Sequence, residues 1–132
     1  MRRKLFISMV VALVLPSLVS PVFGHHSFSA EFDATKPVQM EGVVTRVEWM
    51  NPHVYFYMDV ADATGKVVNW ACEMGSPNAL QRQGWNRNTL KTGMKVAFEG
   101  TLAKDGSSKT NARNVTVDGK RLGAASSEGV TP

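Results

Sequence analysis

Three histidines are the residues of this sequence best suited to chemistry at neutral pH. His25 and His26 are adjacent and directly follow an apolar leader, in the stretch VFGHHSFSAEFD, and His53 stands in the later stretch NPHVYF. If the leader is removed after Gly24, His25 becomes the first residue and gains a free α-amine. An α-amine has a pKa near 7.7–8.0 and an imidazole one near 6.5, so both offer neutral nitrogen donors around neutral pH.

These nitrogens predict a copper site. The amine and imidazole of His25 can chelate one metal ion together, and a second imidazole completes a T-shaped set of three nitrogens, a histidine brace, which suits Cu(II). His26 can supply that imidazole, and so can His53 if the N-terminal arm folds back along the body. Removal after Phe23 instead gives Gly-His-His, where the amine, two backbone nitrogens and His26 bind Cu(II) or Ni(II). Zinc is less favoured, because no carboxylate or thiol stands at ligand spacing beside the histidines.

A second interpretation of the histidines involves no metal. In it, His25 and His26 are polar residues that help leader processing, and His53 caps the turn after Asn51-Pro52.

Two tyrosines form another candidate binding site. Tyr55 and Tyr57 alternate with apolar residues, so their rings point the same way, beside His53 and Asn69 on the outer face of a predicted hairpin. Stacking aromatics with a polar neighbour can hold a sugar, an aromatic metabolite or a nucleobase. The competing interpretation is that the tyrosines cover a half-exposed sheet through cross-strand pairing.

The sequence favours a binding protein over an enzyme. The stretch EMGSPNALQRQGWNR gathers polar groups at a helix N-terminus, but it is better explained by a helix capped by Ser76 with Trp85 filling the barrel end. Ser76 has no evident base, and the sequence shows no paired carboxylates and no phosphate loop. A copper-dependent redox enzyme is the least favoured class.

Residues 1–24 have the anatomy of a cleaved signal peptide. A basic start at residues 2–4 precedes an apolar run over residues 5–18, which is shorter than the roughly 20 residues that span a bilayer. We therefore expect a periplasmic or secreted protein with no stable membrane anchor after cleavage. Three of the fifteen Lys and Arg lie in the leader, so twelve remain against eleven Asp and Glu, a net charge of +1 that argues against nucleic acid.

The remaining chain predicts one domain. We expect an N-terminal arm over 25–37, a barrel over 38–120 and a disordered tail over 121–132. Within the barrel, β-branched and alternating patterns predict strands over 38–50, 53–62, 66–74, 94–104 and 112–120, with Gly42 at a bend and a short helix between Ser76 and Gly84. Cys72, the single cysteine, is expected to be a small buried residue.

This order, β-β-β-α-β-β, is that of an OB-like fold: an all-β, five-stranded Greek-key barrel with one short helix. The predicted interior consists of Val54, Phe56, Met58, Val68, Trp70, Met74, Leu80, Val96, Phe98, Leu102 and Val115.

Four stretches also carry a family resemblance: HHSFSAEFD, KPVQMEGVVTRVEWMNPHVYFYMDV, NWACEMGSPNALQRQGW and LKTGMKVAFEGTLAKDGS. They resemble a group of small exported bacterial domains of unknown function, over essentially all of residues 25–119. The resemblance implies a periplasmic β-barrel domain and implies no activity.

The sequence thus predicts an exported binding protein that holds copper through His25, His26 and His53. The alternative is a metal-free interaction module that binds a small molecule or a periplasmic protein through Tyr55, Tyr57 and Asn69.

Overall fold

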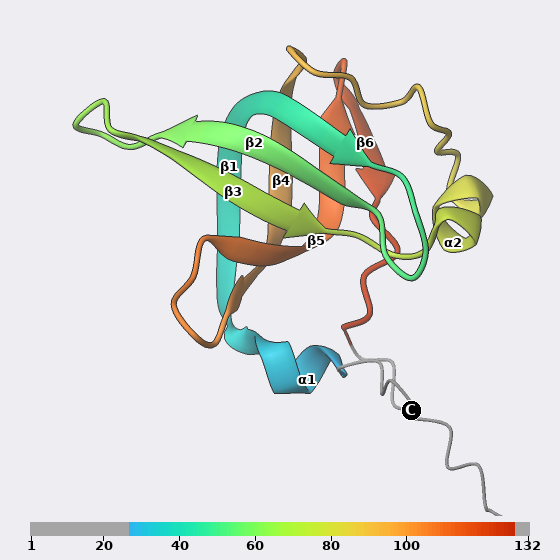
Figure 1. The fold of residues 1–132 in the computed structure, drawn as a ribbon, viewed down its shortest axis with the longest axis horizontal. Coiled ribbons are helices and arrows are strands. Elements are labelled where there is room, and N and C mark those ends of the chain that lie inside the picture. The colour runs from blue at the N-terminus through green and yellow to red at the C-terminus, as the bar shows by residue number, and fades with distance from the viewer. Residues whose placement is uncertain (1–26, 129–132) are drawn as a thin grey trace, which may run out of the picture.

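One long strand organises the barrel in the computed structural model, which describes residues 27–128. That strand is β1, and the elements in chain order are α1 (Phe28–Glu31), β1 (Phe32–Glu48), β2 (Tyr55–Ala61), β3 (Val67–Glu73), α2 (Pro77–Arg82), β4 (Lys95–Ala103), β5 (Lys109–Val117) and β6 (Lys120–Gly123). Figure 1 shows β1 bending so that its two halves belong to different sides of the barrel.

The strands close into a barrel through β1 and one parallel pair. The first half of β1 pairs antiparallel with β4 and its second half with β2, and the sheet order is β3-β2-β1-β4-β5-β6. A parallel pairing of β3 with β5 closes the ring. This strand pairing confirms the predicted OB-like barrel, with β6 as a sixth strand that the sequence did not predict.

Gly42 stands where β1 passes from one partner to the other. It pairs with Val96 of β4, and the next residue, Val43, pairs with both β4 and β2. A Cβ atom at Gly42 would lie 2.4 Å from the carbonyl oxygen of Asp59. Glycine is therefore required because the β2 backbone approaches β1 too closely for any side chain, which confirms the predicted bend.

Most of the predicted interior is buried. Val54, Phe56, Met58, Met74, Leu80, Val96, Phe98 and Val115 form the core, together with Cys72 and Trp85. Val68 is half-buried, and Trp70 packs partly buried against this core. Leu102 was predicted wrongly: past Gly100 the buried side chains of β4 are those of Thr101 and Ala103, while Leu102 is half-buried. This change of face along β4 is not revealed by the sequence pattern.

The predicted helix is confirmed with its caps. Ser76 is the N-cap, and its hydroxyl oxygen accepts a hydrogen bond from the amide of Ala79 at 3.3 Å. Gly84 follows the helix with φ of +90°, a conformation that glycine adopts without strain. Trp85 is buried, and its indole Nε1 donates to the carbonyl oxygen of Gly123 at 2.7 Å.

The two ends of the barrel domain differ from the predicted bounds. The barrel begins at Phe32 rather than residue 38, because Phe32 already pairs with Ala103. The segment from 121 to 128 is not a disordered tail: β6 pairs with β5, and Leu122 and Ala124 are buried. Apolar side chains and strand pairing offset the cost of ordering a segment whose composition is small and polar. Residues 129–132 lie outside the described part of the chain.

Candidate functional site

Two tyrosines and their charged partners cover the outer face of β2 and β3. Tyr55 and Tyr57 are both half-buried, and their ring centroids lie 6.4 Å apart with an interplanar angle of 26°. The rings therefore share one face, as the alternation along β2 predicts. This face belongs to the hairpin that projects from the barrel in Figure 1.

Tyr57 is held by a carboxylate and covered by a cation. Its hydroxyl donates to Glu48 at 3.1 Å, and the guanidinium carbon of Arg46 lies 3.9 Å from its ring centroid. Arg46 also pairs with Glu48 at 3.0 Å. Burial and the hydrogen bond to Glu48 raise the pKa of Tyr57 above its usual value. A ligand that stacks on this ring must displace Arg46 or use the other side.

Tyr55 also contacts a carboxylate and a cation, in a more buried part of the same face. Its hydroxyl donates to Glu73, a carboxylate that is only 5% exposed. Lys109, on β5, lies 5.3 Å from the Tyr55 ring centroid, 3.5 Å from the Glu73 carboxylate, and in an ion pair with Glu31 of α1. Burial, with the adjacent Glu73, raises the pKa of Tyr55. Partial burial lowers the pKa of Lys109, but its hydrogen bonds to Glu31 and Tyr55 outweigh this and raise it overall.

Asn69 lies on the same face, one row from Tyr57. Its amide donates to Asp59 at 2.8 Å and to Thr45 at 3.1 Å. All three side chains predicted to bind a ligand are thus engaged within the fold, as expected for cross-strand pairs that stabilise a half-exposed sheet. Their role in ligand binding stays a prediction.

His53 lies in the loop before β2, beside the end of β3, rather than in the strand itself. Its Nδ1 is 3.1 Å from the carbonyl oxygen of Met74 and 3.9 Å from the nearer oxygen of Glu73. A carbonyl oxygen only accepts, so Nδ1 carries the proton and donates, which leaves the Nε2 lone pair unprotonated in the neutral ring. His53 is thus a nitrogen ligand whose tautomer is already set, and its side chain is 29% exposed.

The other two predicted metal ligands, His25 and His26, lie outside the described residues. Within residues 27–128, no group of three or more His, Cys, Asp and Glu side chains could hold a metal ion. A copper site that uses His53 therefore needs ligands from the segment that precedes Ser27.

α1 attaches that N-terminal segment to the barrel. The Phe28 and Phe32 rings lie 5.5 Å apart, and Phe32 is buried. The amide of Lys104 donates to the Glu31 carbonyl at 2.9 Å, and the Lys104 ammonium donates to the Ser29 carbonyl at 2.5 Å. α1 is thereby fixed to the loop between β4 and β5.

Sequence reasoning missed the contact of Glu31, Glu73 and Lys109. These residues are far apart in the chain, on α1, β3 and β5, and no spacing relates them. The signal in the sequence is a charged residue, Glu73, at the end of β3, and its position before Ser76 favours a helix N-terminal cluster instead.

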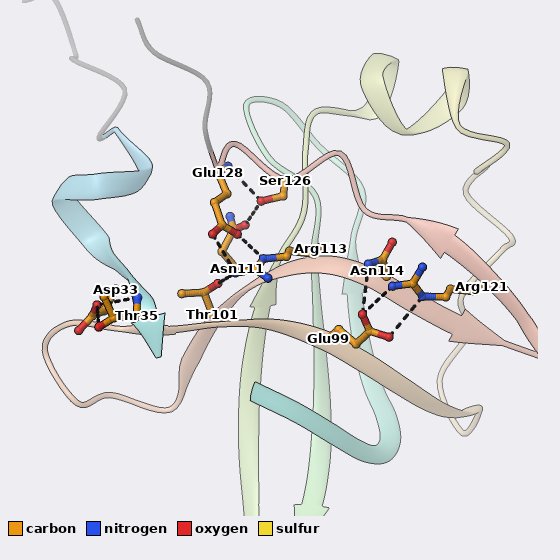
Figure 2. A network of polar contacts seen from close by, with 10 residues as sticks. All are labelled: Asp33, Thr35, Glu99, Thr101, Asn111, Arg113, Asn114, Arg121, Ser126 and Glu128. Atoms are coloured by element: carbon orange, nitrogen blue, oxygen red, sulfur yellow. Dashed lines mark hydrogen bonds and ion pairs between the residues drawn. The ribbon is translucent and has the colours of Figure 1, made fainter. Parts of the chain in front are cut away.

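A separate hollow lies over β1, β4 and β5. Its volume is about 280 Å³, and it is lined by Gln39, Met40, Glu41, Ala97, Phe98, Glu99, Asn114 and Thr116. At its border Glu99 pairs with Arg121 of β6 at 2.7 Å, as Figure 2 shows. Of the predicted site residues that the structure describes, His53, Tyr55, Tyr57 and Asn69, none lines this hollow.

The strand pairing and the polar face define a small OB-like β-barrel domain. Residues 13–112 match the model of the Family of unknown function (DUF6152), and the chain belongs to this family. No match was found among curated proteins. The chain is similar to the N-terminal domain of PriB protein from Thermoanaerobacter tencongensis, whose structure is dimeric, at 19% identity and a TM-score of 0.41, over 63% of this chain and 96% of that one.

At that identity and overlap, the likeness says nothing about what this chain binds. Among residues 27–128, no helix is long and apolar enough to cross a membrane.

Proposed function

We propose that the protein is an exported binding protein that holds Cu(II) at the N-terminus created by removal of residues 1–24. The ligands are the α-amine and imidazole of His25 and a second imidazole from His53, or from His26 in its place. Nitrogen-rich, roughly planar ligand sets suit Cu(II). The protein's place of action is the periplasm or the exterior of the cell.

The observation that carries the proposal is the hydrogen bond from His53 to Met74, at 3.1 Å. Histidines that ligate metals almost always donate their other ring N–H to a carbonyl or carboxylate, which fixes the tautomer and orients the ring. His53 has this arrangement with Met74, with Glu73 3.9 Å away. A histidine that only caps a turn does not need a ring that is 29% exposed and whose Nε2 has no hydrogen-bond partner among residues 27–128.

The attachment of α1 supports the same proposal. Lys109 contacts Glu31 of α1 and Glu73, and Glu73 lies next to His53. His25 precedes Ser27 by two residues, so their Cα atoms are at most about 7.6 Å apart. The start of the described chain is therefore tied to the same cluster of side chains as His53.

The first test uses protein that has been exported with its own leader. Intact mass fixes the first residue, and titration with Cu(II) followed by electron paramagnetic resonance counts the coordinating nitrogens. We expect a chain starting at His25 that keeps one Cu(II) at micromolar concentration with three nitrogens. A correct start with no copper retained at micromolar concentration would exclude the proposal.

Variants identify the ligands. A single Ser added before His25 should abolish tight binding, because it removes the amine from the chelate. His53→Gln should reduce the nitrogen count by one if His53 is the second imidazole; if His26→Gln does so instead, His26 holds that position.

The alternative function is a metal-free interaction module that uses the β2–β3 face. The stacked pair of Tyr55 and Tyr57 favours it, since half-buried aromatic rings offer contact area at low entropic cost. Capture of a periplasmic partner or small molecule that is lost in Tyr57→Ala, but unchanged by the added Ser, would support this alternative over copper binding.

A further inference from the structure

We propose that the barrel has a peptide-binding site, which the chain's own residues 124–128 occupy in place of an acidic segment of a partner protein. We call residues 124–128 the C-terminal segment. The residues that hold it are Gly75, Thr101, Asn111 and Arg113, and we call them the Arg113 site. This site contains none of the proposed copper ligands, so the inference goes beyond the proposed function and does not depend on it.

Arg113 holds the carboxylate of Glu128 through two hydrogen bonds. Its Nε donates to one carboxylate oxygen, and its Nη2 donates to the other at 2.8 Å and to the Thr101 hydroxyl oxygen at 3.3 Å. Figure 2 shows this fork, with Thr101 beside the guanidinium. Bidentate pairing of arginine with a carboxylate adds geometric specificity to a charge-assisted bond. Arg113 is thus a receptor for a carboxylate.

The Arg113 site also binds the backbone of the C-terminal segment. The amide of Ala124 donates to the Arg113 carbonyl at 2.8 Å, and the amide of Gly75 donates to the Ala124 carbonyl at 2.9 Å. Ala124 is fully buried, and a Cβ atom at Gly75 would lie 2.4 Å from the Ala125 carbonyl oxygen. Glycine therefore lets a peptide lie directly against the end of β3. Backbone hydrogen bonds of this kind give peptide sites their affinity, and fitted side chains give them specificity.

A serine is the third group that the site recognises. The Ser126 hydroxyl donates to the side-chain oxygen of Asn111 at 2.5 Å and accepts from the amide of Glu128 at 3.0 Å. Asn111 is 1% exposed and Thr101 is fully buried. Polar side chains buried this deeply are costly unless they are hydrogen-bonded. Here they bond to the segment itself or to Arg113, so the site fits the pattern small-small-Ser-any-Glu.

The conformation of the C-terminal segment is imposed by the site. Ala125 has φ of +48°, in the left-handed region that residues other than glycine adopt at a cost. Residues 124–128 form neither helix nor strand, so contacts with the Arg113 site must offset this cost. A segment held in this way can be exchanged for another that makes the same contacts.

Charge identifies the partner segment as acidic. Among residues 27–128, no carboxylate other than that of Glu128 lies within 4.0 Å of the Arg113 guanidinium. When the C-terminal segment leaves, Arg113 therefore loses its counter-charge beside two polar side chains, Thr101 and Asn111. A peptide that brings a carboxylate to the same place restores the pairing.

The barrel offers a matched control in a second pair of arginine and glutamate. Arg121 donates to Glu99 through Nε at 3.3 Å and Nη2 at 2.7 Å, also as a fork. Both side chains are more exposed than those of Arg113 and Glu128. This pair joins β6 to β4 and holds no part of the C-terminal segment, as Figure 2 shows.

The experiment uses the exported full chain and two labelled peptides of residues 124–132, one with the natural Glu128 and one with Glu128→Gln. In the protein, Glu128→Gln keeps the shape of the side chain but removes its charge. We expect this variant to bind the natural peptide at least about tenfold more tightly than wild type does, because its own segment competes less well. The Gln peptide should bind at least about tenfold more weakly than the natural one.

Hydrogen exchange shows whether the peptide occupies the same place. The Gly75 amide donates to Ala124, so its exchange reports whether a segment is bound. It should exchange faster in Glu128→Gln and slow again when the natural peptide is added. Adding Arg113→Gln to that variant should abolish peptide binding, whereas adding Arg121→Gln should leave the affinity within about twofold.

Three results would overturn the proposal. The first is no saturable binding by Glu128→Gln at about 1 mM peptide, the range of effective concentration that the attached segment has. The second is equal affinity for the two peptides, which decides the question even if Arg113→Gln does not fold. The third is a stable dimer of Glu128→Gln in light scattering that the natural peptide does not dissociate, since a second copy would then fill the site.

Discussion

At the scale of single residues, burial decides what Cys72 can do. Its side chain is fully buried, and burial raises the pKa of the thiol from about 9 to about 12. The thiolate is the reactive form, so Cys72 should neither react nor pair with another chain in the folded protein. We expect no reaction with Ellman's reagent at pH 8 until a denaturant unfolds the chain, and rapid reaction in the native state would contradict the burial.

The raised pKa of Cys72 also predicts in which direction the free energy of unfolding changes with pH. The thiol ionises near pH 9 when unfolded but near pH 12 when folded, so the folded state holds its proton more tightly. The free energy of unfolding should therefore fall above pH 9, by up to about 1.4 kcal/mol per pH unit. Urea unfolding of Cys72→Ala, which keeps both tyrosines, should lack this part of the fall between pH 9 and 11.

At this scale the sequence revealed which residues could do chemistry but not how they are held. His53, Tyr55 and Tyr57 were found because their types and alternation are informative locally. Glu73 and Lys109 were missed because their contact joins β3 to β5, and parallel pairing leaves no trace in spacing along the chain.

At the scale of elements, β6 is the main departure from the predicted fold. Its pairing with β5 buries Leu122, and the carbonyl of Gly123 accepts from Trp85. Leu122→Ala should lower the free energy of unfolding by about 2 kcal/mol, since a buried leucine loses both transfer energy and packing. Lys120→Ala, on the same strand but exposed, should change it by less than about 0.5 kcal/mol in urea unfolding. Equal small effects would mean that β6 does not contribute to the folded core.

The elements that sequence predicted well are those whose pattern is local. β2 alternates between more and less buried side chains, β3 does so over its first four residues, and α2 has both an N-cap and a glycine after its end. The register shift between β4 and β5 beside Gly100 and the strand β6 could not be predicted in the same way. Their positions are set by what lies opposite them, on β5 and at Trp85, and composition alone favoured disorder for the last residues.

At the scale of the whole molecule, charge argues against the nucleic-acid binding that is common among OB-folds. Residues 25–132 have a net charge of +1, and among the described residues the side chains around Tyr55 and Tyr57 combine the carboxylates of Glu31, Glu48 and Glu73 with the paired cations Arg46 and Lys109. Binding to single strands depends on a positively charged groove beside stacking aromatics. Here the stacked tyrosines are present but the groove is not positive.

We therefore expect no binding of a fluorescein-labelled 20-nucleotide single strand at 10 micromolar protein and about 50 mM salt, measured by fluorescence anisotropy. Low salt strengthens phosphate contacts, so the absence of binding at low salt is stronger evidence than its absence at high salt. Saturable binding whose affinity falls steeply between 50 and 200 mM salt would contradict the prediction and reveal a phosphate-contacting surface. Sharing a fold with nucleic-acid binders does not imply their function, and the charges around these tyrosines give no reason to expect phosphate binding.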